Sequence, residues 1–126
     1  MRWTQEQREA IEYRGENILL AAAAGSGKTA VLVQRIIELI EKDNVSVNEL
    51  LVLTFTDAAA GEMREKIKKA ISAALKAHPD NEHLQKQRLL IHSSSISTVH
   101  SFCLNTLKSN IHLTSLPVDF SIISET

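Results

Sequence analysis

The sequence predicts an α/β fold in which a parallel sheet is flanked by helices on both faces. Short apolar runs, typical of strands buried in a parallel sheet, occur at residues 18–22 and 50–53, and residues 96–99 are a third, short strand candidate that is flanked in the same way. A segment with helical spacing of apolar residues follows each run. One helix, followed by strand and helix repeated three times, is the element order of a layered α/β domain with crossover connections.

Local signals place the first two helices. Thr4 and Gln7 match the capping-box pattern, so a short helix is expected over residues 4–13, and Gly15 interrupts it. A second helix is expected over residues 29–42, because its apolar residues recur at helical spacing. These residues are Leu32, Val33, Ile36, Ile37, Leu39 and Ile40.

The most regular amphipathic helix is expected to begin at Asp57 and to end before Pro79, since proline cannot continue the hydrogen-bond ladder of a helix. Its apolar stripe consists of Met63, Ile67, Ala70, Ile71, Ala74 and Leu75. The remaining expected elements are a short helix over 80–91, a loop at 93–95, a helix over 101–108 and a terminal strand at 121–123.

The composition is that of an ordinary globular protein, with 44% apolar and 23% charged residues. The net charge of −1 is not the basic balance common in nucleic-acid-binding domains, so any DNA contact must come from local groups. A single cysteine, Cys103, can form neither an internal disulfide nor a metal cluster. No apolar run approaches the roughly 18 residues of a membrane span. We therefore expect a cytoplasmic protein without a membrane partner.

Residues 22–29 match a phosphate-binding loop, because a predicted strand precedes them and a predicted helix follows. Gly25 and Gly27 permit the backbone angles of an anion-binding nest, and the helix directs its positive end at the same place. Lys28 supplies a charge for the β- and γ-phosphates, and Thr29 a hydroxyl for Mg²⁺. The first position of the motif, usually glycine, is alanine in this chain. The expected nucleotide contacts are Ala22, Ala23, Ala24, Gly25, Ser26, Gly27, Lys28 and Thr29.

The loop alone does not identify the class of enzyme, since small-molecule kinases, GTPases and helicases all use it. Two other segments distinguish them: residues 54–57 follow the second expected strand, and residues 99–102 follow the third. Ligands of open parallel sheets bind at the carboxyl ends of the strands. Three candidate functional segments are therefore expected at one edge of one sheet.

These segments resemble the N-terminal part of a superfamily 1 DNA helicase of the UvrD/RecB type. The segments around Gln7, Lys28, Phe55 and His100 are similar, in that order, to the family's glutamine motif, Walker A loop, motif Ia and motif Ib. Within the family, the alanine-rich loop and residues 97–103 look closest to the helicase–nuclease subunits of bacterial AddAB complexes. The resemblance implies a P-loop NTPase fold of the RecA-like type that uses ATP and Mg²⁺. The partners it implies are single- and double-stranded DNA and an AddB-like subunit, in double-strand-break repair and recombination.

By this resemblance, Lys28 and Thr29 are the catalytic residues of the loop, and Gln7 hydrogen-bonds the adenine. The alternative for Gln7 is the capping box, and both roles can hold because an amide has several bonding sites. The family often has arginine after the loop threonine. That contact cannot be carried over to Ala30.

The resemblance also implies DNA contacts. Phe55 would stack on a base of single-stranded DNA, with a core aromatic as the alternative. Thr56, His100 and Ser101 would face the DNA backbone, although a histidine at a strand end is equally often structural. The family usually has asparagine where this chain has Asp57, and a carboxylate is unhelpful beside phosphate, so Asp57 is interpreted as a helix N-cap.

Other parts of the family's motor are missing from the sequence. No Asp-Glu pair of the Walker B type follows the third expected strand, and the arginines of a second motor domain are absent. We expect residues 1–126 to be an incomplete first RecA-like domain, which binds nucleotide weakly and does not turn it over. A P-loop nucleotide or small-molecule kinase is one alternative, but it leaves Phe55, Thr56 and His100 unexplained. A non-catalytic nucleotide-binding fragment is the other.

Overall fold

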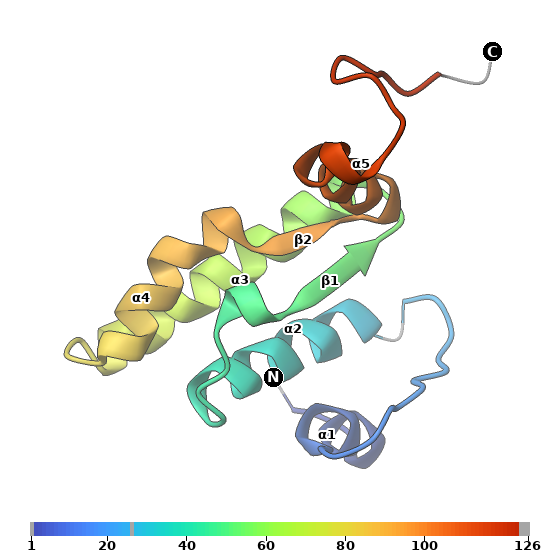
Figure 1. The fold of residues 1–126 in the computed structure, drawn as a ribbon. Helices are drawn as coiled ribbons and strands as arrows, with labels where there is room; N and C mark the ends of the chain where they lie inside the picture. The colour runs from blue at the N-terminus through green and yellow to red at the C-terminus, as the bar shows by residue number, and fades with distance from the viewer. Residues whose placement is uncertain (1, 26, 124–126) are drawn as a thin grey trace.

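The computed structural model describes residues 2–25 and 27–123 (Figure 1). Within these residues the chain forms five α-helices and two strands. Their bounds are α1 Gln5–Glu12, α2 Lys28–Glu41, β1 Leu51–Thr54, α3 Asp57–Ala77, α4 Glu82–Leu90, β2 Ser95–Thr98 and α5 Val99–Ser109. Short 3₁₀ turns lie at Val47–Glu49, Ile91–Ser93 and Ile111–Leu113. No helix in the described part of the chain combines the length and the apolar character that a membrane span requires.

The first helix starts as predicted. The Thr4 hydroxyl accepts a hydrogen bond from the Gln7 backbone N–H at 3.2 Å, and the Gln7 side-chain oxygen accepts from the Thr4 backbone N–H at 2.9 Å. This reciprocal pair satisfies two N–H groups that have no partner inside the helix. The expected interruption is also present, because Gly15 has a φ of +103°.

The strands β1 and β2 pair in parallel, with Thr54 beside Thr98, so the chain leaves both strands at the same end of the sheet. The connection between them runs through α3 and α4. Val52 and Ile96 are buried in the same cluster as the apolar stripe of α3. On the other face Leu51 and Leu53 remain 50% and 41% exposed. The prediction of helices on both faces is therefore wrong for the described sheet.

The main core lies between α2, α3 and α4. Its fully buried side chains include Ile40 of α2, Ile67 and Ile71 of α3, and Gln87 of α4. The one polar member of this set is satisfied, because the Gln87 side-chain oxygen accepts from the backbone N–H of Val47 at 2.7 Å. Helix α3 thus presents the stripe that its sequence predicts. Helix α4 packs on it through apolar contacts and is also tied to Val47 by the Gln87 hydrogen bond.

The expected strand at residues 18–22 is wrong. This segment is a loop in which Leu19 is 94% exposed, and the described sheet consists of β1 and β2 alone. An isolated extended segment cannot satisfy its backbone groups in a ladder. Apolar composition is therefore not enough to make a strand here.

Smaller differences concern element ends. The predicted helices over 57–78 and 80–91 are confirmed, with the cap of α4 provided by Asn81. β2 begins at Ser95, inside the expected loop at 93–95, and α5 begins at Val99, two residues before the expected start. Residues 121–123 form no strand, and 124–126 lie outside the described residues.

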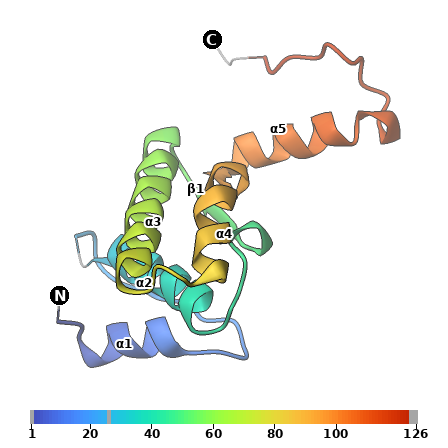
Figure 2. The same cartoon turned by 90° about the vertical axis from the view of Figure 1, so that its left-hand side faces the viewer.

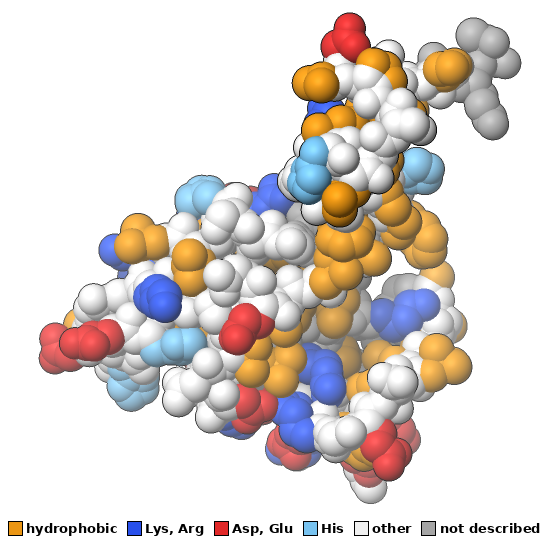
Figure 3. Space-filling model, in the orientation of Figure 1, with side chains coloured by type: hydrophobic (Ala, Val, Ile, Leu, Met, Phe, Trp, Pro, Cys, Tyr) orange, Lys and Arg blue, Asp and Glu red, His pale blue; other side chains and the backbone are white. Residues whose placement is uncertain are grey.

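Helix α5 stands away from the rest of the molecule. Figure 2 shows it extending beyond α3 and α4, and the segment that follows turns at the far end of α5 and runs back above the helix. None of its residues is fully buried. In the space-filling view, hydrophobic side chains gather below α5 (Figure 3). The helix is therefore placed mainly by its junction with β2.

Candidate nucleotide and DNA site

The loop before α2 has the backbone that the sequence predicts. Gly25 and Gly27 have φ values of +80° and +83°, in the left-handed region that residues with a side chain rarely adopt. Gly27 is the N-cap of α2 and brings no side-chain oxygen to the first-turn N–H groups. An anion bound at this helix end would accept from those groups. Ser26, also a predicted contact, lies outside the described residues.

Two predicted phosphate and metal contacts begin α2. The Lys28 ammonium donates a hydrogen bond to the Ala22 carbonyl at 2.8 Å and so closes the loop on itself. Lys28 and Thr29 are both exposed. This hydrogen bond therefore lies at the protein surface, where a competing acceptor can reach the ammonium.

Helix α1, which carries Gln7, lies against this loop. A side-chain carbon placed on Gly27 would lie 3.6 Å from the side-chain nitrogen of Gln7. Gln7, Ala22 and Lys28 line one cavity of about 280 Å³. A second cavity of about 300 Å³, which also contains Lys28, extends along α2 to Arg35. The structure thus brings together two motifs that are about twenty residues apart in the sequence.

The charge of Glu6 limits which part of a nucleotide can lie on the α1 side of the cavity that Gln7 and Lys28 line. Hydrogen bonds from its own backbone N–H and from the Thr4 hydroxyl lower the pKa of the Glu6 carboxyl. It is therefore an anion at neutral pH and lines the cavity on the α1 side. A triphosphate avoids a carboxylate, so the α1 side suits an uncharged base and the Lys28 side suits phosphates.

The corner after β1 exposes the predicted stacking residue. Phe55 is 100% exposed, so its interpretation as a core aromatic is wrong. Thr56 is the N-cap of α3, and its hydroxyl oxygen accepts from the Ala59 backbone N–H at 3.1 Å. The interpretation of Asp57 as the cap is wrong, because Asp57 occupies the first turn, where a carboxylate interacts favourably with the positive end of the helix.

The corner after β2 is built in the same way. Thr98 is the N-cap of α5, accepts from the Ser101 backbone N–H at 3.1 Å and lies 3.0 Å from the Ser101 hydroxyl. His100 is exposed and Ser101 is half-buried. Because Thr54 and Thr98 are ladder neighbours, both corners lie at one end of the sheet.

The loop and the corners share one side of the molecule. In Figure 1 the loop before α2 lies on the side toward which the arrowhead of β1 points. The expectation that three segments share one sheet edge is confirmed for the two corners. It is wrong for the loop, since residues 18–22 belong to no described strand.

The side chains present fit magnesium only as a nucleotide-bound ion. Within residues 2–25 and 27–123 no group of three His, Cys, Asp or Glu side chains could hold a metal. The exposed Thr29 hydroxyl lies beside the loop. Mg²⁺ favours a small number of protein oxygens together with phosphate oxygens and water. The donor set therefore suits Mg²⁺ carried by a triphosphate.

Two arginines have contacts that the sequence does not predict. Arg64 lies in a run of basic residues with Lys66, Lys68 and Lys69, which is typical of a solvated helix face, but it donates to the Ile96 carbonyl of β2 at 2.6 Å. Arg35 of α2 donates to carbonyls of α1. Both act on backbone oxygens of distant segments, and no spacing pattern in the sequence signals such contacts.

A loop with left-handed glycines at the start of a helix, beside parallel strands connected through helices, defines an α/β nucleotide-binding domain. Residues 3–126 match the UvrD/REP helicase N-terminal domain family. The chain belongs to this family.

Relatives with one shared name occur in several bacteria. The chain is 54% identical to an ATP-dependent helicase/nuclease subunit of Clostridioides difficile (strain 630), over 99% of this chain and 10% of that protein. It is 52% identical to the protein of that name from Clostridium novyi (strain NT), over 100% of this chain and 10% of the relative. It is 55% identical to the protein of that name from Clostridium perfringens (strain ATCC 13124), over 99% of this chain and 10% of the relative. The chain thus spans about a tenth of the length of these relatives.

Proposed function

We propose that this chain is the ATP-binding part of an ATP-dependent DNA helicase–nuclease. The whole protein would move along single-stranded DNA during double-strand-break repair and recombination. The observation that carries the proposal is the cavity that Gln7 and Lys28 line together. It places an amide suited to a base and an ammonium suited to phosphates on one site. The relatives, which are named as ATP-dependent helicase/nuclease proteins, support the same activity.

The loop residues would bind the triphosphate. The Lys28 ammonium would exchange the Ala22 carbonyl, now 2.8 Å away, for β- and γ-phosphate oxygens. Backbone N–H groups of the loop and of the first turn of α2 would surround the same oxygens. Mg²⁺ would neutralise phosphate charge, and the Thr29 hydroxyl is the group that would hold it. Gln7 would read the adenine through its amide.

The two strand corners would bind DNA. Phe55 offers a fully exposed ring face, which suits stacking by an unpaired base. Thr56, His100 and Ser101 stand at the same end of the sheet, where hydroxyl and backbone N–H groups suit phosphate contacts. Base stacking with backbone contacts and no reading of base edges is the pattern of a protein that binds single strands without sequence preference.

The remaining parts of the activity lie with other segments. Phosphoryl transfer needs a Walker B acidic pair and arginines of a second motor domain, which residues 1–126 do not contain. We propose that this chain is the N-terminal part of the first RecA-like domain. We further propose that the whole protein works in the cytoplasm with an AddB-like subunit on single- and double-stranded DNA.

Replacement of the loop lysine tests the proposal. In the intact gene product, Lys28→Ala should abolish ATP binding and hydrolysis, because it removes the mobile charge for the phosphates. The matched control is Lys86→Ala on the exposed face of α4, which should leave both unchanged. Wild-type ATP affinity in Lys28→Ala would contradict the assignment.

A second assay separates the proposal from a P-loop kinase. Single-stranded DNA should stimulate the ATPase of the intact gene product. A phosphorylated small-molecule product without such stimulation would favour a kinase instead.

A further inference from the structure

Helix α1 carries Gln7 but is attached to the rest of the molecule by a small contact. Its buried residues are Ala10 and Ile11, which pack with Val31 of α2 and with Trp3. This cluster is separate from the main core. The position of Gln7 relative to the phosphate loop therefore depends on whatever else holds α1 against α2.

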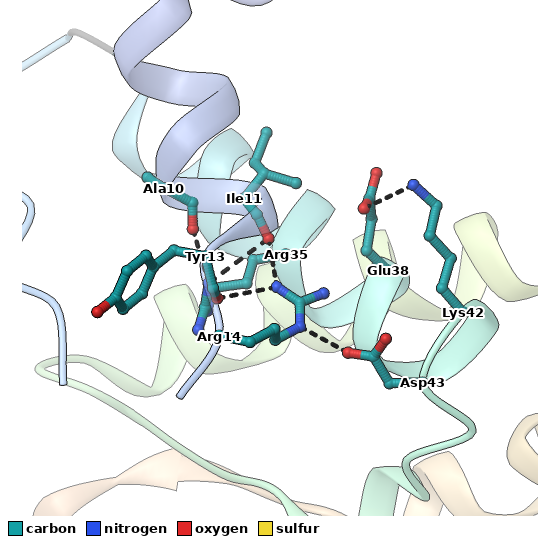
Figure 4. A network of polar contacts seen from close by, with 8 residues as sticks. All are labelled: Ala10, Ile11, Tyr13, Arg14, Arg35, Glu38, Lys42 and Asp43. Carbon is teal, nitrogen blue, oxygen red and sulfur yellow. Dashed lines mark hydrogen bonds and ion pairs between the residues drawn. The ribbon is translucent and has the colours of Figure 1, made fainter. Parts of the chain in front are cut away.

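A guanidinium from α2 holds the C-terminal end of α1 (Figure 4). The Arg35 Nη1 donates to the Ala10 carbonyl at 2.8 Å and to the Tyr13 carbonyl at 2.7 Å. The last carbonyls of a helix have no donor inside it, and that end carries partial negative charge. Arg35 thus caps α1 from a neighbouring helix, with charge-assisted hydrogen bonds.

A second arginine completes the cap. The Arg14 Nη1 donates to the carbonyls of Ile11 and Tyr13 at 2.8 and 3.0 Å, and the Arg14 Nε lies 2.5 Å from Asp43. Two guanidinium groups therefore share the Tyr13 carbonyl. Burial and the neighbouring charge of Arg14 lower the pKa of Arg35, whereas Asp43 acts in the opposite direction. Asp43 thus offsets the repulsion that would otherwise separate the two arginines.

The contacts between α1 and α2 form a series along both helices. Gln7 adjoins Gly27, the Ala10 and Ile11 pair packs on Val31, and Tyr13 meets Arg35. The contact between the two helices therefore extends from the phosphate loop as far as Arg35. Lys28 and Arg35 stand about two helical turns apart on α2. One end of α2 meets the phosphates, and Arg35 anchors the helix that carries the base-reading amide.

We propose that Arg35 is a positioning residue for base recognition, which holds Gln7 at a fixed place beside the phosphate loop. The inference rests on the proposed function, because it requires that Gln7 reads a base at this site. Without Arg35, the C-terminal end of α1 loses two charge-assisted hydrogen bonds from α2. Gln7 then no longer stays where the phosphate-bound nucleotide presents its base. The affinity of the loop for phosphates does not depend on Arg35.

The test compares a ligand with a base and a ligand without one. In the intact gene product, dissociation constants for ATP and for inorganic tripolyphosphate are measured for wild type and Arg35→Met, with Arg88→Met on the exposed face of α4 as the control. The ATP dissociation constant should rise up to roughly tenfold in Arg35→Met, as expected when the Gln7 amide loses its hydrogen bond to the base. The tripolyphosphate constant should stay unchanged, and the control should match wild type for both ligands.

A double-mutant cycle with Gln7→Ala shows whether Arg35 acts through the glutamine. The double variant should bind ATP no more weakly than Gln7→Ala alone, because the two changes remove one function. Arg35→Lys keeps the charge but not the guanidinium fork, so it should raise the ATP dissociation constant by less than Arg35→Met does. It replaces Arg35→Met in the test if that variant does not fold.

Several outcomes would overturn the inference. These are equal weakening of ATP and tripolyphosphate, additive effects in the cycle, and unchanged ATP affinity in Arg35→Met. Wild-type protein that binds neither ligand would instead overturn the proposed function itself. The two failures are therefore distinguishable.

Discussion

Phe55→Ala is the sharpest test of the DNA-binding corner, because the structure separates stability from binding at this residue. A buried phenylalanine replaced by alanine typically loses about 3–5 kcal/mol of stability through the cavity that is left. Phe55 is 100% exposed and leaves no cavity. The free energy of unfolding should therefore change by less than about 0.5 kcal/mol, as for most surface substitutions.

Binding should respond much more strongly. Stacking of one base on an aromatic ring contributes about 1–3 kcal/mol, so the dissociation constant for single-stranded DNA should rise about 5- to 150-fold. Fluorescence anisotropy of a labelled oligonucleotide, at one fixed salt concentration, measures this constant in the intact gene product. Affinity for ATP without DNA should remain that of the wild type, because Phe55 does not line the loop cavity.

Two companion variants test whether the aromatic ring of Phe55 is what binds the DNA. Phe55→Tyr keeps a ring and should retain most of the affinity, whereas Leu89→Ala changes another exposed apolar side chain, on α4, and should have no effect. The stacking role would be refuted by wild-type DNA affinity in Phe55→Ala. An equal loss in Phe55→Tyr would refute it as well.

Three further predictions concern other parts of the chain. Gln87→Leu should lower the free energy of unfolding in urea by about 1–3 kcal/mol, because the buried N–H of Val47 loses its acceptor; Lys86→Leu on the exposed face should change it little. Gly27→Ala should weaken ATP binding, since its left-handed backbone costs about 1–2 kcal/mol for a residue with a side chain. Gly61→Ala within α3, where an added carbon meets nothing, should leave binding unchanged and serves as control. The isolated 126-residue chain should show no DNA-stimulated ATPase in a phosphate-release assay, and measurable turnover would disprove the need for the missing segments.

The helices were predictable because their signals are local. The capping box of Thr4 and Gln7, the apolar stripe of α3 and the stop at Pro79 all act within a few residues of the element they define. The segment at residues 18–22, where a strand is predicted, is at least as apolar as β1. A strand needs a neighbour, however, and composition does not supply one.

The candidate site was predictable in part for the same reason. The left-handed angles of Gly25 and Gly27 follow from the motif itself. The exposure of Phe55 could not be derived from its position at a strand end alone, because a core aromatic can also occupy such a position. Arg35 carried no signal, because its partners are backbone carbonyls, which every residue has.

The small sheet also determines how the isolated chain must be handled. Each strand has one neighbour in the described sheet and an unpaired edge on its other side, and Leu51 and Leu53 are half-exposed on one face. Unpaired edges next to apolar side chains are templates for self-association. Solutions of the chain should therefore form larger species as concentration rises, and light scattering at each working concentration belongs with every binding measurement.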